Sequence, residues 1–168
     1  MNAIVTGGRD AGKTTTVRRV AGLLEERGLD PVGFYTAGGP ETLELVSVRT
    51  GDRTVFASRS AELDGPRVGR YAVDRGAIER GLAWADEPGD VLLADEIGKL
   101  ERRGEGFAPL LETLRPDRYR GVLLSVRQGL APFAAEAFPP DARPERFEVT
   151  PSNREDLPAR IADLLVET

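Results

Sequence analysis

The segment GGRDAGKTT, residues 7–15, has the spacing G-x-x-x-x-G-K-[ST], with Gly7, Gly12, Lys13 and Thr14 at the fixed positions. Glycines let the backbone wrap closely around phosphate groups, and N–H groups at the start of a helix point at them. A lysine here reaches the β- and γ-phosphates, and a hydroxyl ligates Mg²⁺. The residues predicted to bind the phosphates of a nucleotide are Gly7, Gly8, Arg9, Asp10, Ala11, Gly12, Lys13, Thr14 and Thr15.

Lysine is rare in this chain, which makes its position informative. Of 23 basic residues, only Lys13 and Lys99 are lysines, and the rest are arginines. A chain that uses arginine almost everywhere yet keeps lysine at the motif position indicates that an ammonium group is needed there. Lys13 is therefore also a candidate catalytic residue, because it can neutralise charge on the transferred phosphate.

A second candidate segment is DVLLADE, residues 90–96, an apolar run that ends in two carboxylates. A carboxylate at the carboxyl end of a buried strand points into the crevice where ligands bind. Asp95 is predicted to order the Mg²⁺ shell, through water. The chain contains no histidine and no cysteine, so acid–base chemistry must use carboxylates. Glu96 is the candidate that activates the attacking water.

The elements that must position these residues alternate between strands and helices. Apolar runs predict strands at 2–6, 32–36, 90–96 and 121–126, and weaker runs predict strands at 70–73 and near 146–150. The polar stretch 59–70, which contains glycine and proline, is predicted to be a loop. Amphipathic periodicity predicts helices after the Gly-rich turn, after Asp74, near 107–114 and from 157 onward. Strands that are apolar on both sides indicate a mostly parallel sheet with helices on both faces. The turn Thr50–Arg53 predicts a small antiparallel hairpin inserted at 43–58.

Composition excludes several classes of protein. At 168 residues, the chain is expected to be a single domain spanning 1–168. Its net charge of −5 argues against a general nucleic-acid surface. The N-terminus lacks the basic and apolar regions of a signal peptide, and no apolar run approaches the length of a membrane span. We expect a cytoplasmic protein, a monomer, with a nucleoside triphosphate as substrate and no membrane partner.

Five segments together resemble a known family. GRDAGKTT, GFYT, VGRYAVD, DEIGKLE and SNREDLP occur in an order that resembles the THEP-type nucleoside-triphosphatases, the group that includes the cancer-related nucleoside-triphosphatase. The resemblance spans most of the chain. It implies a three-layer, RecA-like P-loop fold, Mg²⁺ as cofactor, and slow hydrolysis of nucleoside triphosphates with broad base specificity. This chain carries Asp10 where the family's loop usually has glycine; aspartate tolerates a left-handed backbone, and Arg9 lies beside it.

Other motifs have a functional and a structural interpretation. Arg70 could supply charge at the γ-phosphate as an internal arginine finger, or pair with a surface acid. Lys99 could sense phosphate, or pair with a nearby glutamate. Asn153 and Asp156 fit a loosened N-K-x-D motif that contacts the base, with Arg154 in the lysine position, whereas Ser152 and Glu155 fit a capping box. Tyr35 and Trp84 could stack on a base or pack within the protein.

Three functions fit these residues. The first is a Mg²⁺-dependent nucleoside-triphosphatase. The second is a nucleotide-gated switch or binding protein, because DEIG at 95–98 also reads as D-x-x-G. The third is a kinase that transfers the γ-phosphoryl group to a small acceptor, with the 40–60 insertion as a lid. Strong guanine preference would favour the switch, and turnover that requires an added acceptor would favour the kinase.

Overall fold

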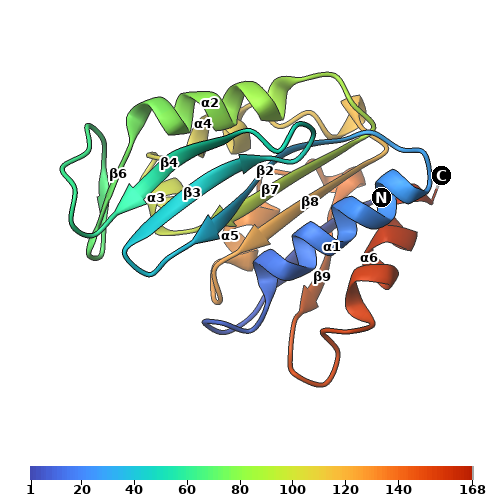
Figure 1. Cartoon of the computed structure of the whole chain (residues 1–168). Coiled ribbons are helices and arrows are strands. Elements are labelled where there is room, and N and C mark those ends of the chain that lie inside the picture. The colour runs from blue at the N-terminus through green and yellow to red at the C-terminus, as the bar shows by residue number, and fades with distance from the viewer. Residues whose placement is uncertain (168) are drawn as a thin grey trace.

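A nine-stranded sheet runs through the molecule, and helices cover both of its faces (Figure 1). The computed structural model describes residues 1–167. The strands are β1 (Asn2–Thr6), β2 (Pro31–Gly38), β3 (Thr42–Ser47), β4 (Arg53–Ser58), β5 (Arg67–Val68), β6 (Tyr71–Val73), β7 (Val91–Ile97), β8 (Gly121–Val126) and β9 (Glu145–Glu148). The helices are α1 (Lys13–Glu26), α2 (Arg75–Asp86), α3 (Lys99–Arg102), α4 (Ala108–Glu112), α5 (Ala131–Ala135) and α6 (Leu157–Val166), with short 3-10 turns at Pro116–Arg118 and Pro140–Ala142.

The order of the strands brings the two candidate segments together. Across the sheet the order is β5-β6-β4-β3-β2-β7-β8-β1-β9. The pairs β2–β7, β7–β8, β8–β1 and β1–β9 are parallel, whereas β2–β3, β3–β4, β4–β6 and β6–β5 are antiparallel. The carboxyl ends of β1 and β7 therefore lie at one edge of the sheet, separated only by β8. Five neighbouring strands, from β2 through β7, β8 and β1 to β9, are thus parallel, which confirms the predicted α/β sheet with an inserted antiparallel part.

Two layers of apolar side chains hold the helices to the sheet. Helices α1 and α6 pack on one face, with Val17, Leu24 and Ile161 fully buried against the sheet. Helices α2, α4 and α5 pack on the other face (Figure 1). The amphipathic helix predicted after the Gly-rich turn is α1, and its buried face runs from Val17 to Leu24. The Asp74 side chain caps α2 by accepting a hydrogen bond from Ala77 N.

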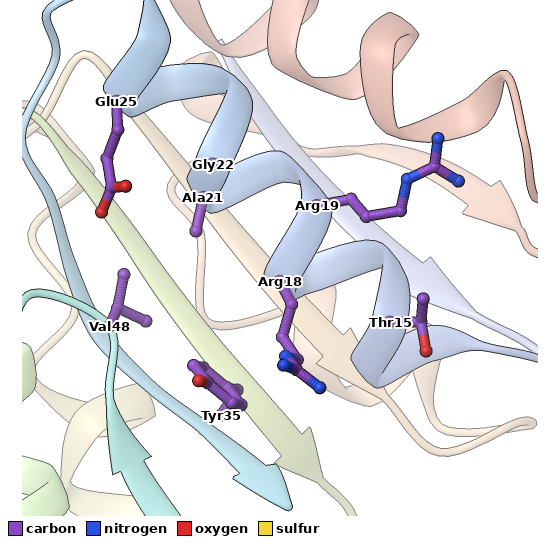
Figure 2. A pocket seen from close by; sticks show the side chains of 8 residues that line it. All are labelled: Thr15, Arg18, Arg19, Ala21, Gly22, Glu25, Tyr35 and Val48. Carbon is purple, nitrogen blue, oxygen red and sulfur yellow. The ribbon is translucent and has the colours of Figure 1, made fainter. Parts of the chain in front are cut away.

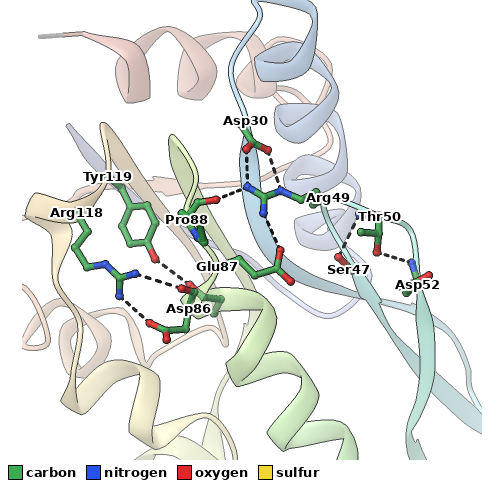
Figure 3. A network of polar contacts seen from close by, with 11 residues as sticks. Asp30, Ser47, Arg49, Thr50, Asp52, Asp86, Glu87, Pro88, Arg118 and Tyr119 are labelled. Atoms are coloured by element: carbon green, nitrogen blue, oxygen red, sulfur yellow. Dashed lines mark hydrogen bonds and ion pairs between the residues drawn. The ribbon is translucent and has the colours of Figure 1, made fainter.

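The predicted hairpin at 43–58 is confirmed as β3 and β4, and it carries part of the core. Phe56 on β4 stacks on Phe107 with ring centroids 5.6 Å apart, and Phe107 stacks on Phe34 of β2 at 4.2 Å. At the turn of the hairpin, Arg49 donates hydrogen bonds to the carboxylates of Asp30 and Glu87, the residues near the starts of β2 and β7 (Figure 3). The hairpin is thus fixed to the sheet at both of its ends.

Three local expectations differ from the structure. The stretch 59–70, expected to be a loop, contains the short edge strand β5. Of the apolar stripe 107–114, only Ala108–Glu112 is helical, as α4; Phe107 precedes this helix and Leu114 follows it. The capping box is wrong: α6 begins at Leu157, the Ser152 hydroxyl lies against that of Thr150, and no side chain caps the helix. Within residues 1–167, no helix is long and apolar enough to cross a membrane.

Candidate active site

The phosphate loop joins β1 to α1, as the sequence predicts. It turns tightly, with Ala11 N donating a hydrogen bond to Gly8 O at 3.1 Å. Gly12 precedes α1 with φ of 108°, a backbone conformation that L side chains rarely adopt. Lys13 Nζ lies over the loop and donates to Gly7 O at 2.9 Å. The ammonium group is therefore held at the mouth of the loop, next to the free N–H groups at the start of α1.

The departure at Asp10 is accommodated by the backbone. Asp10 adopts φ of 59°, the left-handed conformation for which glycine is usually required and which aspartate tolerates. Gly7, by contrast, has no room for a side chain, because an added Cβ would lie 2.8 Å from Val149 Cγ1. The loop thus keeps its turn with an exposed aspartate, whereas the position next to β9 admits only glycine.

Asp95 connects the loop to the strand end. It is fully buried, and its Oδ2 accepts three hydrogen bonds: from Thr14 Oγ1 at 2.7 Å and from Thr36 N and Oγ1 at 3.2 Å each. Its Oδ1 is buried without a partner among residues 1–167. A buried carboxylate oxygen without a donor suits a divalent cation or one of its waters, and Mg²⁺ is commonly held by one carboxylate together with substrate phosphates. Thr14 and Asp95 therefore fit the predicted metal site.

Glu96 lies at a break in the strand. The pairing of β7 with β8 shifts register between Ala94 and Ile97, and Glu96 has φ of 65°, which is strained for a glutamate. This irregularity turns its side chain out to solvent while Asp95 stays buried. Protein still surrounds the carboxylate on the inner side: desolvation, and then the charge of Asp95, raises the pKa of Glu96 to about 7, although Lys13 opposes the shift. A group with this pKa can take up a proton at neutral pH.

Two site residues that sequence reasoning missed follow β8. A Cβ added at Gly8 would lie 3.8 Å from Gln128 Oε1, so the Gln128 side chain reaches the phosphate loop. Arg127 lies beside Gly98, with its Cβ 3.6 Å from a Cβ added there, and its charge lowers the pKa of Glu96. The order of the strands could have indicated these two residues. The apolar run 121–126 is a parallel strand, so its carboxyl end lies at the same end of the sheet as the carboxyl ends of β1 and β7, where ligands bind.

Arg70 and Lys99 lie in different parts of the molecule. Arg70 is on the exposed turn between β5 and β6, and β4, β3, β2, β7 and β8 separate β6 from β1. Those six strand steps span roughly 29 Å along the sheet at about 4.8 Å each. In this conformation Arg70 is not brought to the phosphate loop. Lys99 is exposed at the start of α3, three residues after Glu96, and so lies on the same edge as the site.

The segment 150–156 lies next to the phosphate loop, but its Asn153 side chain bonds backbone groups of the same turn. Asn153 Oδ1 accepts from Thr150 N at 2.8 Å, and Asn153 Nδ2 donates to Glu148 O at 2.8 Å. Arg19 of α1 donates to the main-chain oxygen of Arg154 at 3.3 Å and contacts the Glu155 carboxylate at 3.3 Å. Asn153 therefore shapes the turn, and the Arg154 side chain is exposed beside it.

The pocket next to the loop runs along the flank of α1 (Figure 2). It has a volume of about 540 Å³ and extends from Thr15 to Glu25, with Tyr35 and Val48 as its opposite wall. The Arg18 guanidinium lies 5.2 Å from the centre of the Tyr35 ring, so one face of that ring already has a cationic partner. Trp84 is 8% exposed in the core, which excludes it as a stacking platform for a base.

Comparisons with known proteins agree with this geometry. The sequence profile of the NTPase family matches residues 2–162. The nucleoside-triphosphatase THEP1 of Methanopyrus kandleri is 31% identical over 99% of this chain and 96% of its own. The crystal structure of THEP1 from the hyperthermophile Aquifex aeolicus superposes with a TM-score of 0.72 at 26% identity, covering 99% of this chain and all of the other. The solution structure of a human cancer-related nucleoside triphosphatase shares the fold, with a TM-score of 0.73 at 24% identity over 98% of this chain and 96% of the other. The chain therefore belongs to the NTPase family, whose members hydrolyse nucleoside triphosphates.

Proposed function

We propose that the protein is a Mg²⁺-dependent nucleoside-triphosphatase that releases the γ-phosphate of ATP, GTP and other nucleoside triphosphates with weak base preference and slow turnover. The observation that supports it most is Asp95, a buried carboxylate that bonds Thr14 of the phosphate loop and keeps one oxygen free of donors. This contact joins the phosphate-binding element and the carboxylate pair in one site.

The loop would bind the substrate through its backbone. The free N–H groups of the loop would surround the phosphates, and Lys13 would leave Gly7 O to contact their oxygens. Thr14 and Asp95 would hold Mg²⁺, which when bound neutralises charge on the phosphate oxygens. Gln128, which reaches Gly8, adds a polar group on the same side of the loop.

Glu96 would orient and deprotonate the water. The water oxygen attacks the γ-phosphorus, the bond from that phosphorus to the bridging oxygen breaks, and the water proton passes to the Glu96 carboxylate. The position supports this role, because Glu96 is turned out of the strand beside Asp95 and its pKa of about 7 suits proton uptake at neutral pH. The charge that develops on the phosphate oxygens would be met by Lys13.

Segment 150–156 supports the proposal of weak base preference. Asn153 is committed to two backbone groups of its own turn, and the lysine position of the base-reading motif holds Arg154. Neither side chain is preorganised to read one base. Slow turnover is consistent with the distance of Arg70 from the loop, because an arginine finger contributes a large part of the rate where one is present.

The test is a turnover panel of ATP, GTP, CTP and UTP with and without Mg²⁺, alongside a measurement of nucleotide release. We expect phosphate release only with Mg²⁺, and rates for ATP and GTP within about tenfold, or about 1.4 kcal/mol. Lys13→Ala is the control, which should lose triphosphate binding. Undiminished binding in Lys13→Ala contradicts the loop assignment, and a thousandfold guanine preference that Asp156→Asn abolishes would favour a switch instead.

A further inference from the structure

Unpartnered polar atoms gather at the carboxyl ends of neighbouring strands. Within residues 1–167, four buried side-chain atoms lack a hydrogen-bond partner, and they are Thr6 Oγ1, Arg59 Nε, Asp95 Oδ1 and Ser125 Oγ. Thr6 ends β1, Ser125 is the last but one residue of β8, and Asp95 lies near the end of β7. Because β7, β8 and β1 are adjacent, three of the four atoms lie at the edge that carries the site.

Ser125 and Asp95 point to the same face of the sheet. Leu124 pairs with Ala94, so Ser125 and Asp95 are the next residues on two neighbouring parallel strands. Side chains alternate along a strand, and Leu123 and Leu93 belong to the core cluster under α1 and α6. Ser125 and Asp95 therefore both face the start of α1, where Thr14 lies.

Thr6 serves as an internal comparison. Its neighbour Val5 packs in the cluster under α1 and α6, so the alternation turns the Thr6 side chain to the opposite face. The two unpartnered oxygens that share a face are thus Ser125 Oγ and Asp95 Oδ1. Both residues are 0% exposed, and buried polar groups in native proteins normally have a partner from protein, water or ligand.

The chemistry of Ser125 Oγ and Asp95 Oδ1 indicates which kind of ligand they can bind. Asp95 Oδ1 can only accept hydrogen bonds when ionised, and its charge disfavours a phosphate oxygen at short range. A hydroxyl can both donate and accept. The group that fits between them carries donors or positive charge, as the waters around a hydrated cation do.

We propose that Ser125 is a further metal-side residue of the site: Ser125 Oγ and Asp95 Oδ1 together bind the hydrated divalent cation through water. This inference rests on the proposed function. Both oxygens of Asp95 are then used: Thr14 and Thr36 hold Oδ2, and Oδ1 bonds the water shell of the cation, which Ser125 Oγ also bonds. Groups that hold a metal's ligands typically contribute tenfold to a hundredfold in metal affinity.

The experiment measures how Mg²⁺ controls nucleotide binding rather than turnover. A fluorescent, non-hydrolysable ATP analogue is bound to the full chain while Mg²⁺ is titrated, and the same binding is measured in EDTA. For Ser125→Ala we expect the Mg²⁺ concentration at half-saturation to rise about fivefold or more, with unchanged affinity in EDTA. Ser125→Cys, which keeps the size but offers a weak donor, should shift in the same direction.

Thr6→Val is the matched control, because it removes an unpartnered buried hydroxyl from the opposite face. It should leave the Mg²⁺ half-saturation unchanged. The assignment of Ser125 is overturned by a smaller shift than fivefold in both Ser125 variants, by an equal shift in Thr6→Val, or by an equal loss of affinity in EDTA. If nucleotide binding and turnover of the parent protein are both independent of Mg²⁺, the proposed function itself fails. That outcome is seen in the parent protein, so it can be told apart from the three outcomes in the variants that overturn the role of Ser125.

Discussion

Replacing Thr36 by valine removes one of the three hydrogen bonds that hold Asp95 while keeping the shape of the side chain. Thr36 is 5% exposed on β2, and its Oγ1 donates to Asp95 Oδ2 at 3.2 Å. The Thr36 N–H and the Thr14 hydroxyl remain as donors to the same oxygen. Hydrogen bonds to charged groups contribute about 1.5–3 kcal/mol, and with two donors left we take about 1.5 kcal/mol as the loss in unfolding free energy.

That loss is measurable by urea or thermal unfolding of the protein without nucleotide. For a chain of this size, 1 kcal/mol lowers Tm by about 2–4 °C, so Thr36→Val should lower it by about 3–6 °C. Thr36→Ser is the control, because it retains the hydroxyl and should lie closer to the parent. An unfolding free energy for Thr36→Val within about 0.5 kcal/mol of the parent, the range of neutral surface changes, would refute the idea that this hydroxyl secures Asp95.

Two further predictions concern the support of the site. Gly33→Ala should fail to yield folded protein, because a Cβ at its φ of 111° would lie 1.9 Å from Leu93 O. The control is Gly22→Ala, where an added Cβ has nothing within 4 Å; this variant should fold and be up to about 1 kcal/mol more stable than the parent. Equal solubility and Tm of the two variants would contradict the prediction. Desolvation raises the pKa of Glu101 above its ordinary value of 4.5, so the folded state binds this proton more tightly than the unfolded chain. The stability of the parent relative to Glu101→Gln should therefore increase as pH falls from neutral toward about 4.5 in parallel urea titrations, and a flat difference would contradict the pKa direction.

The phosphate loop and the main strands could be predicted because local patterns determine them. The fixed spacing from Gly7 to Thr14 specifies the loop, and the apolar periodicity of α1 and the apolar runs of β1, β7 and β8 reflect burial directly. The hairpin was also predictable, since Gly51 follows a β-rich run. These features depend on residues that are close together in sequence.

The remaining features depend on contacts between distant residues. The hydrogen bonds of Thr36 to Asp95 become visible only when β2 is known to lie beside β7. The irregular strand end that exposes Glu96 follows from the register shift against β8, which has no local signature. The capping-box prediction was wrong because Glu155 contacts Arg19 of α1 instead of the backbone at Ser152. Arg19 is distant in sequence, so the local motif gives no sign of this contact. The position of Arg70 likewise follows from strand order alone.

Turnover and binding by Glu96→Gln test the central claim most directly, because this substitution keeps the size of the side chain and removes its ability to take a proton. Positioning and deprotonating a water contributes about 10²–10⁴ in rate. The protein should therefore bind Mg²⁺-ATP at least as tightly as the parent while its single-turnover rate falls by about a hundredfold or more. Hydrolysis at the parental rate would contradict the role of Glu96 as the base, and loss of nucleotide binding would instead make Glu96 a residue of the binding site.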